Sequence, residues 1–163
     1  MLIKLKNKDT LIIDDYKFRC CIGKNGVNPK KTEGDKSTPK GKFSLGKIYY
    51  RADRVLKPET KIPIKIITKK MGWCDDPKNK NYNKEIKINK KIKCEKLFRK
   101  DQIYDYLLVI NFNIKKRIPY KGSAIFLHIT KNFKSTLGCV AIKKKDFLIL
   151  AKLIIKNTKI LIS

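Results

Sequence analysis

Short apolar runs separated by turn-forming residues are the feature that most restricts the fold of this chain. Apolar and polar residues alternate over residues 1–22, and further strand-like runs cover residues 42–55, 62–68, 104–113 and 122–130. Alternation with a period of two is typical of β-strands that bury one face. The sequence therefore predicts a mainly β domain.

Helical periodicity is confined to a small part of the chain. A short helix is expected over residues 92–100, and a closing strand is expected over residues 158–163. After Cys139, four apolar residues follow the helical spacing i, i+3, i+4 and i+7: Phe147, Leu150, Ala151 and Ile154. We therefore expect a β-rich α+β fold with one or two helices, one of which follows Cys139.

The length and the charge of the chain narrow its organisation and its partners. The 163 residues are expected to form a single domain, 1–163, because this length buries a core without a disulfide or a metal. The net charge of +27 favours anionic partners. Only five of the 41 basic residues are arginine, and no nucleic-acid-binding motif is present, so we expect no specific nucleic acid. A polyanion-binding module remains the alternative to an enzyme.

The five cysteines and the single histidine do not form a zinc-finger or zinc-ribbon pattern, and we expect no metal and no cofactor. No pair of cysteines has C-x-x-C spacing, and one histidine cannot complete a zinc-finger set. Free thiols are expected at Cys20, Cys21, Cys74, Cys94 and Cys139.

The N-terminal residues carry no recognisable targeting signal. They contain no uninterrupted apolar segment and no small-residue cleavage site, and no apolar run in the chain approaches the length of a membrane span. The sequence as written therefore predicts no signal peptide, no transmembrane segment and a cytoplasmic location.

The stretch FLHITKNFKSTLGCVAI combines the only histidine, His128, with Cys139. His128 lies at the end of a predicted strand, and the connection to Cys139 is long enough to reverse the chain. A thiol becomes a useful nucleophile when a base lies beside it. Gly138 leaves room beside the sulfur and leaves backbone N–H groups free for an oxyanion. Spacing alone leaves two interpretations open, a catalytic pair or a structural cysteine and histidine.

Three elements in this order resemble the L,D-transpeptidase catalytic domain family (YkuD-like), in a compact bacterial branch. They are the T-P-x-G-x-F element at Thr38–Phe43, the strand ending in His128, and the S-T-L-G-C element ending at Cys139. The resemblance runs over nearly the whole chain and includes YRADR (50–54), GWCDDP (72–77) and GSAIFLH (122–128).

The resemblance implies a mixed sheet or sandwich, with catalysis at Cys139 and His128 and peptidoglycan stem peptides as donor and acceptor. Cys139 would attack a stem-peptide carbonyl, His128 would move the proton, and the backbone N–H groups of Leu137, Gly138 and Cys139 would hold the oxyanion. The resemblance implies that the protein acts in the periplasm or cell envelope, whereas the N-terminus predicts a cytoplasmic location. Further substrate contacts are expected from the following residues: Tyr49, Arg51, Asp53, Trp73, Ser135 and Thr136.

Two positions depart from the common family pattern. Leu137 stands where a second histidine is usual, and Ala141 stands where arginine or asparagine is frequent. These differences leave the acyl acceptor open between an amine, which gives a cross-link, and water, which gives a carboxypeptidase or amidase. Arg51 and Asp53 could instead form a structural ion pair. Trp73 could instead pack in the core or in a lid without contacting substrate. The sequence does not indicate an oligomeric state.

Overall fold

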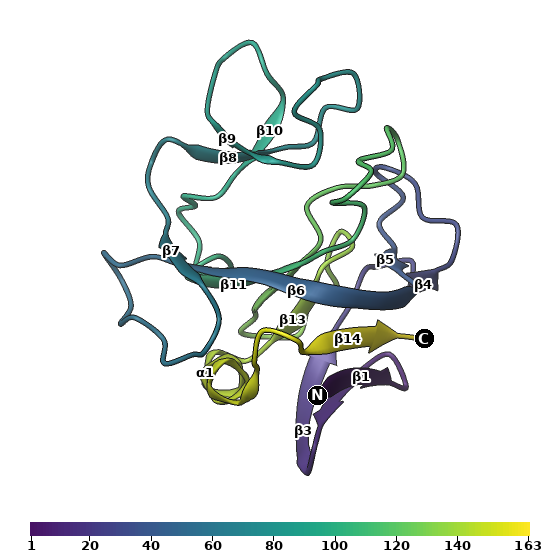
Figure 1. Cartoon of the computed structure of the whole chain (residues 1–163), viewed down its shortest axis with the longest axis vertical. Helices are drawn as coiled ribbons and strands as arrows, with labels where there is room; N and C mark the ends of the chain where they lie inside the picture. The colour runs from purple at the N-terminus through teal and green to yellow at the C-terminus, as the bar shows by residue number, and fades with distance from the viewer.

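A computed structural model describes residues 1–163, and its main feature is a mixed β-sheet that closes into a barrel (Figure 1). One helix, α1, lies near the C-terminus. The fold is therefore mainly β with one helix, as the sequence predicts. The elements are β1 (Leu2–Lys6), β2 (Thr10–Ile13), β3 (Tyr16–Cys21), β4 (Val27–Asn28), β5 (Thr38–Pro39), β6 (Gly41–Tyr50), β7 (Ile64–Ile66), β8 (Met71–Cys74), β9 (Glu85–Lys87), β10 (Cys94–Lys96), β11 (Tyr106–Ile110), β12 (Phe126–Ile129), β13 (Val140–Ile142), α1 (Lys144–Leu153) and β14 (Lys159–Ile162).

The barrel is built from nine strands in the order β11-β12-β13-β3-β2-β1-β14-β6-β7, and it closes where β11 also pairs with β6. Three pairings are parallel, β1 with β14, β12 with β13 and β6 with β7, and the other pairings are antiparallel. Antiparallel neighbours follow one another through short turns, as in β1-β2-β3, whereas each parallel pair needs a longer connection. The connection between β12 and β13 carries the S-T-L-G-C element.

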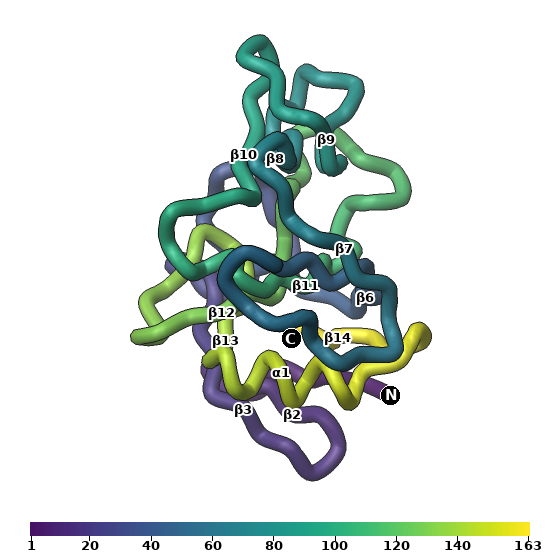
Figure 2. The backbone as a smooth tube through the Cα atoms, turned by 90° about the vertical axis from the view of Figure 1, so that its left-hand side faces the viewer, coloured from purple at the N-terminus to yellow at the C-terminus, as the bar shows by residue number.

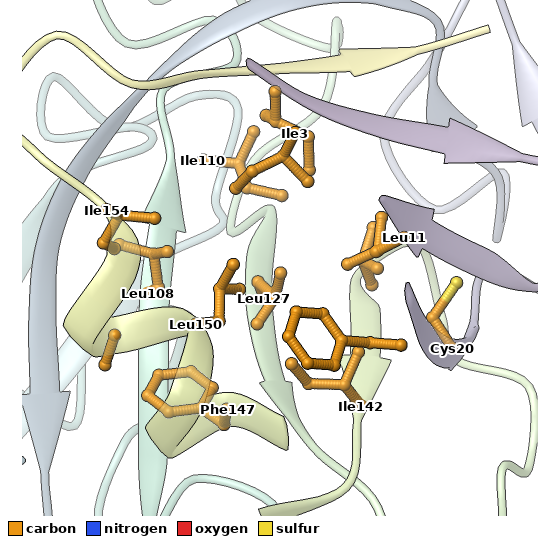
Figure 3. Close-up of a cluster of buried hydrophobic side chains, with 14 of the residues drawn as sticks. Ile3, Leu11, Cys20, Leu108, Ile110, Leu127, Ile142, Phe147, Leu150 and Ile154 are labelled. Atoms are coloured by element: carbon orange, nitrogen blue, oxygen red, sulfur yellow. The ribbon is translucent and has the colours of Figure 1, made fainter. Parts of the chain in front are cut away.

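The inside of the barrel and the inner face of α1 form the larger hydrophobic core. Figure 3 shows Phe147 and Leu150 of α1 directed toward Leu108 and Leu127 of the barrel strands. Phe147 and Leu150 are each 1% exposed, and Ile154 at the end of the helix is fully buried. Asp146 lies in the first turn, where its negative charge interacts favourably with the helix dipole. The helical period read from the sequence therefore identifies the buried face correctly.

A second sheet, in the order β10-β8-β9, lies at one end of the barrel in both views (Figures 1 and 2). Between this sheet and the outer face of the barrel lies a smaller core, which includes Trp73, Leu97, Tyr104, Phe126 and Cys139. Cys139 is thus placed between two sheets, where burial removes water from its surroundings.

The predicted helix over residues 92–100 is wrong. Residues 94–96 form β10, which pairs with β8, and the N–H of Leu97 donates to the carbonyl of Met71 at 3.1 Å. Leu97 is fully buried in the smaller core, so one apolar anchor and a neighbouring strand fix this segment. Tertiary pairing here overrides a local pattern that is too short to nucleate a helix.

Candidate active site

Two adjacent parallel strands carry His128 and Cys139 to the same face of the barrel. His128 of β12 is the register partner of Ala141 of β13, and Cys139 comes two residues before Ala141. Side chains two residues apart in an extended segment lie on one face, so Cys139, Ala141 and His128 share it. Both His128 and Cys139 line one cavity of about 870 Å³. The predicted base and nucleophile therefore line the same cavity, and no hydrogen bond joins them: the sulfur and the imidazole each bond to backbone groups.

The thiol of Cys139 is buried and held by two backbone groups. Its Sγ donates to the carbonyl of Ala124 at 3.3 Å and accepts from the N–H of Phe126 at 3.4 Å. Burial raises the pKa of Cys139 to about 12, and the nearby carboxylate of Glu95 adds to this rise. The Phe126 hydrogen bond and the charge of Lys31 act in the opposite direction. At neutral pH the resting thiol is therefore protonated and needs a base to react.

His128 is arranged to supply that base. Its Nδ1 lies 3.0 Å from the carbonyl of Ile129, and because a carbonyl only accepts, Nδ1 carries the proton and Nε2 is the free acceptor. Burial lowers the pKa of His128 to about 4, so the imidazole is neutral at physiological pH. The ring of Tyr104 packs edge-on against it at 5.5 Å. The Ile129 hydrogen bond and the Tyr104 contact together fix the orientation of the imidazole.

A neutral thiol and a neutral imidazole that line one cavity restrict how the two side chains can react. A preformed thiolate–imidazolium pair would require a low pKa for Cys139 and a high one for His128, and burial shifts both in the other direction. If the pair is catalytic, the proton would have to move from Cys139 to His128 as the sulfur attacks, which is general-base catalysis.

The turn before Cys139 presents backbone donors beside the sulfur. The N–H of Gly138 donates to Oγ1 of Thr136 at 3.1 Å, whereas the N–H groups of Leu137 and Cys139 have no partner within the chain. Of the three predicted oxyanion donors, two are therefore free. Gly138 has φ +141°, and a Cβ there would lie 2.8 Å from the carbonyl oxygen of Ser37. This turn requires glycine.

The long loop that contains the T-P-x-G-x-F element supports this turn. Oγ1 of Thr38 donates to the carbonyl of Gly138 at 2.8 Å and accepts from the N–H of Gly23 at 2.9 Å. The N–H of Lys24 donates to the carbonyl of Thr136 at 2.9 Å, so the loop and the cysteine turn are joined on both sides of Gly138. The two sequence elements that carry the family resemblance are thus in direct contact.

The predicted substrate-binding residues divide into two groups. Ser135 and Thr136 line the cavity. Tyr49, Arg51 and Asp53 do not. Oη of Tyr49 donates to Glu85 at 2.7 Å, and Arg51 makes two 2.8 Å hydrogen bonds to Asp53. Their observed contacts are those of structural side chains.

Trp73 also lies outside the cavity, in the smaller core with Phe126 and Cys139. It is 5% exposed, and its indole N–H donates to Oδ1 of Asn83 at 2.9 Å. Its ring packs edge-on against Phe126 at 5.2 Å, and the N–H of Phe126 is the donor to the Cys139 sulfur. Trp73 therefore supports the strand that holds the nucleophile.

Several charged and aromatic residues of the cavity carry no signal in the sequence. Oη of Tyr104 donates a hydrogen bond to the carboxylate of Glu95, and Lys31 of the long loop forms an ion pair with Asp35. Further charged lining residues are Glu33, Asp75, Lys93, Arg99, Asp101, Lys131 and Lys134. In a chain with 41 lysine and arginine residues, charge alone does not distinguish these positions. No group of three or more His, Cys, Asp or Glu side chains is arranged to hold a metal ion.

Comparison with known proteins agrees with this arrangement. The family model described as YkuD, L,D-transpeptidase catalytic domain, matches residues 3–162. The chain belongs to this family. YkuD domains are cysteine enzymes of the L,D-transpeptidase type, and the substrate of the family is peptidoglycan. No curated protein and no solved structure gave a significant match.

The YkuD match covers the barrel, the second sheet and α1, so every wall of the cavity belongs to the family domain. The ten residues of α1 are too few for a helix that crosses a bilayer, and the structure contains no other helix.

Proposed function

We propose that the protein is an L,D-transpeptidase that cross-links peptidoglycan stem peptides through a thioester at Cys139. Sγ of Cys139 attacks the stem-peptide carbonyl while Nε2 of His128 takes the thiol proton. The C–N bond then breaks, and His128 returns the proton to the departing amine. The observation that carries the proposal is the presence of His128, Cys139 and free backbone N–H groups in one cavity.

Resolution of the thioester completes the reaction. An amine on a second stem peptide attacks the thioester carbonyl, His128 accepts a proton from that amine, and the proton passes to the departing sulfur. In both half-reactions the N–H groups of Leu137 and Cys139 donate to the oxyanion, because they have no other partner. Ser135 and Thr136 line the cavity beside the turn and are positioned to contact the acyl donor.

The test uses a disaccharide-tetrapeptide and intact-protein mass spectrometry. The wild type is expected to show a thioacyl adduct, free D-alanine and a cross-linked dimer, whereas Cys139→Ala shows none of them. Cys94→Ala is the matched control, because this thiol lies outside the cavity. Release of D-alanine without a dimer would indicate hydrolysis and contradict cross-linking. Absence of both products and of the adduct would contradict acyl transfer.

The cell envelope is the proposed place of this reaction, because mature peptidoglycan lies outside the cytoplasmic membrane. Fractionation of cells that express the protein tests this location directly. Recovery from the cytoplasmic fraction alone would contradict it, whatever the result with isolated stem peptides.

A further inference from the structure

A buried lysine lies beside the nucleophile and has no role in the reaction described so far. Lys31, on the loop between β4 and β5, is 6% exposed and lines the cavity. Its Cε lies 3.7 Å from the point where a Cβ on Gly138 would stand. Burial of an ammonium group costs free energy unless a charged partner compensates it. The buried ammonium group of Lys31 therefore needs a charged partner, and its place near Gly138 needs a functional explanation.

Asp35 is the partner, and the surrounding loop fixes it firmly. Nζ of Lys31 donates to Oδ1 of Asp35 at 2.6 Å and to the carbonyl of Thr32 at 3.1 Å. Asp35 also accepts the hydroxyl of Ser37 at 2.6 Å and the N–H groups of Ser37 and Thr32. Burial opposes its ionisation, but these hydrogen bonds hold the pKa of Asp35 well below its usual range. Two of the three ammonium protons are used, and one N–H remains without a partner.

We propose that the Lys31 ammonium stabilises the negative charge that develops at Cys139, first on the sulfur and then on the oxyanion. The sulfur loses its proton to His128 within a buried cavity, where a nearby cation has a larger effect than in water. The role in oxyanion stabilisation rests on the proposed acyl transfer. The effect on the sulfur does not, because any electrophile requires the same thiolate.

Other charged groups around Cys139 set the sign of the effect. Glu95 of β10 raises the pKa of the thiol and Lys31 lowers it, while burial dominates both. His128 and Tyr104 are neutral neighbours at physiological pH. Removing the Lys31 charge should therefore leave only the Phe126 hydrogen bond to oppose burial and Glu95. Removing the Asp35 charge should strengthen the field of Lys31.

Two variants with opposite expected results test the proposal. The rate of Cys139 alkylation by iodoacetamide is measured at pH 8 by peptide mass spectrometry. Lys31→Met should slow it by about tenfold, equivalent to a rise of about one pKa unit, and Asp35→Asn should accelerate it. A role limited to holding the loop would change both rates in the same direction, because both variants break the same ion pair. Equal direction, or no change in either, would overturn the proposal.

The measurement separates this inference from the proposed function. Iodoacetamide reacts without a stem peptide, so the alkylation rates stand even if no cross-link forms. Thermal melting of both variants, followed by circular dichroism, confirms that folded proteins are compared.

An independent observation concerns the two cysteines of the second sheet. Cys74 of β8 and Cys94 of β10 are register partners in adjacent antiparallel strands. The backbone of Cys74 bonds only to the other side, because its N–H donates to the carbonyl of Lys84 and its carbonyl accepts the N–H of Asn83, both at 2.8 Å. Toward β10 the cysteines therefore form a non-hydrogen-bonded pair. Such pairs place Cα atoms about 4.5 Å apart, within the range of a disulfide.

The neighbouring Gly72 leaves space into which the sulfur of Cys94 points, away from Cys74. Sγ of Cys94 lies 2.8 Å from the position of a Cβ on Gly72, so it occupies the space that a side chain would fill. Rotation about the Cα–Cβ bond of Cys94 turns its sulfur from this space toward Cys74. Asp75 and Lys93, which follow and precede the two cysteines, line the active cavity.

We infer that Cys74 and Cys94 form a disulfide when a peroxide is present, and that this bond fixes the strands behind the cavity wall. Cys94 is the more exposed thiol and attacks the peroxide, forming a sulfenic acid and releasing one water. The thiol of Cys74 then displaces a second water and forms the S–S bond. Burial raises the pKa of both thiols, so the reaction is faster at alkaline pH.

Mass spectrometry after hydrogen peroxide treatment tests this inference. The intact mass should fall by about 2 Da, and a non-reducing peptide map should join Cys74 to Cys94. Cys94→Ser should lose the cross-link, and the matched variant Cys20→Ser should retain it. No loss of mass, or a cross-link between any other pair, would overturn the inference. Neither result depends on the catalytic proposal.

Discussion

At the scale of single residues, burial determines the chemistry of the site. Cys139 and His128 are each held by backbone groups, with a hydrogen bond from Phe126 to the sulfur and one from His128 to Ile129. Desolvation keeps both side chains neutral at physiological pH. Such a pair is protected from nonspecific alkylation and oxidation, because the thiolate is the reactive species.

The backbone of Gly138 gives the first prediction at this scale. Gly138→Ala should slow thioacyl formation at least tenfold and lower the free energy of unfolding by about 1–3 kcal/mol, since φ is +141° and the added Cβ meets the carbonyl of Ser37. Single-turnover mass spectrometry measures the rate. Gly26→Ala is the control, because φ there is +73° but only the Lys8 ammonium lies near. Equal slowing in both variants would show that the contact with Ser37 is unimportant.

The buried imidazole gives a prediction on pH and stability. The pKa of His128 is about 4 in the folded protein, against 6.5 for the unfolded side chain. As pH falls through this window, only the unfolded state takes up the proton, so the free energy of unfolding decreases. Urea denaturation at pH 7 and pH 4 should show a loss about 3 kcal/mol larger in the wild type than in His128→Gln. Identical losses would contradict the burial of a neutral His128.

At the scale of elements, the site depends on contacts between segments that are far apart in the sequence. The loop from β3 to β6 supplies Thr38, which joins Gly23 to Gly138 through one hydroxyl. The second sheet supplies Glu95, which meets Tyr104 next to His128. Each wall of the cavity comes from a different element, so the geometry of the nucleophile is set by packing between them.

Thr38→Val tests this dependence with little change in shape. It leaves the N–H of Gly23 and the carbonyl of Gly138 without their buried partner, so we expect a loss of about 1–3 kcal/mol in the free energy of unfolding. Release of the cysteine turn should also slow acylation by about tenfold. Thr10→Val serves as the control, since its hydroxyl bonds only to exposed Asp9. An unchanged acylation rate in Thr38→Val would mean that the turn holds its shape without the loop.

The sequence predicted those elements whose pattern is local. Alternation located β1 to β3, apolar runs located β6, β7, β11 and β12, and the i, i+3, i+4, i+7 spacing located α1 with its buried face. The sequence did not predict β13, which is only three residues long. The helix expected at 92–100 is instead β10, because its pairing with β8 is a long-range interaction without a sequence signature. Closure of the barrel between β11 and β6 is long-range in the same sense.

The same reasoning predicted only some of the residues of the candidate site. His128 and Cys139 stand out through their spacing and the family resemblance, whereas Lys31, Glu95 and Tyr104 do not. Their roles depend on burial, and burial arises only when the long loop and the second sheet fold against β12. Arg51 and Trp73 illustrate the reverse: chemically suggestive side chains that packing places outside the cavity.

At the scale of the whole molecule, the charge is strongly unbalanced. The net charge is +27, and the structure contains six ion pairs, most of them partly exposed. Repulsion among surface lysines therefore outweighs attraction between paired groups, and compactness is maintained by the two hydrophobic cores. A net positive field of this size favours anionic partners.

Salt should therefore stabilise this protein. Raising sodium chloride from 20 to 500 mM shortens the Debye length to a few ångström and screens the repulsion, so the urea midpoint of unfolding should increase. Fluorescence of Trp73 follows the transition, since the indole is buried in the native state. A midpoint that falls with salt would show that the ion pairs dominate.

The parallel pairing of β1 with β14 has a consequence for folding during synthesis on the ribosome. β14 lies between β1 and β6, so neither edge is satisfied until residues 159–162 have left the ribosome. Until then β1 and β6 expose open strand edges, which can pair with other chains. The barrel of the nascent protein therefore stays open until residues 159–162 have been translated.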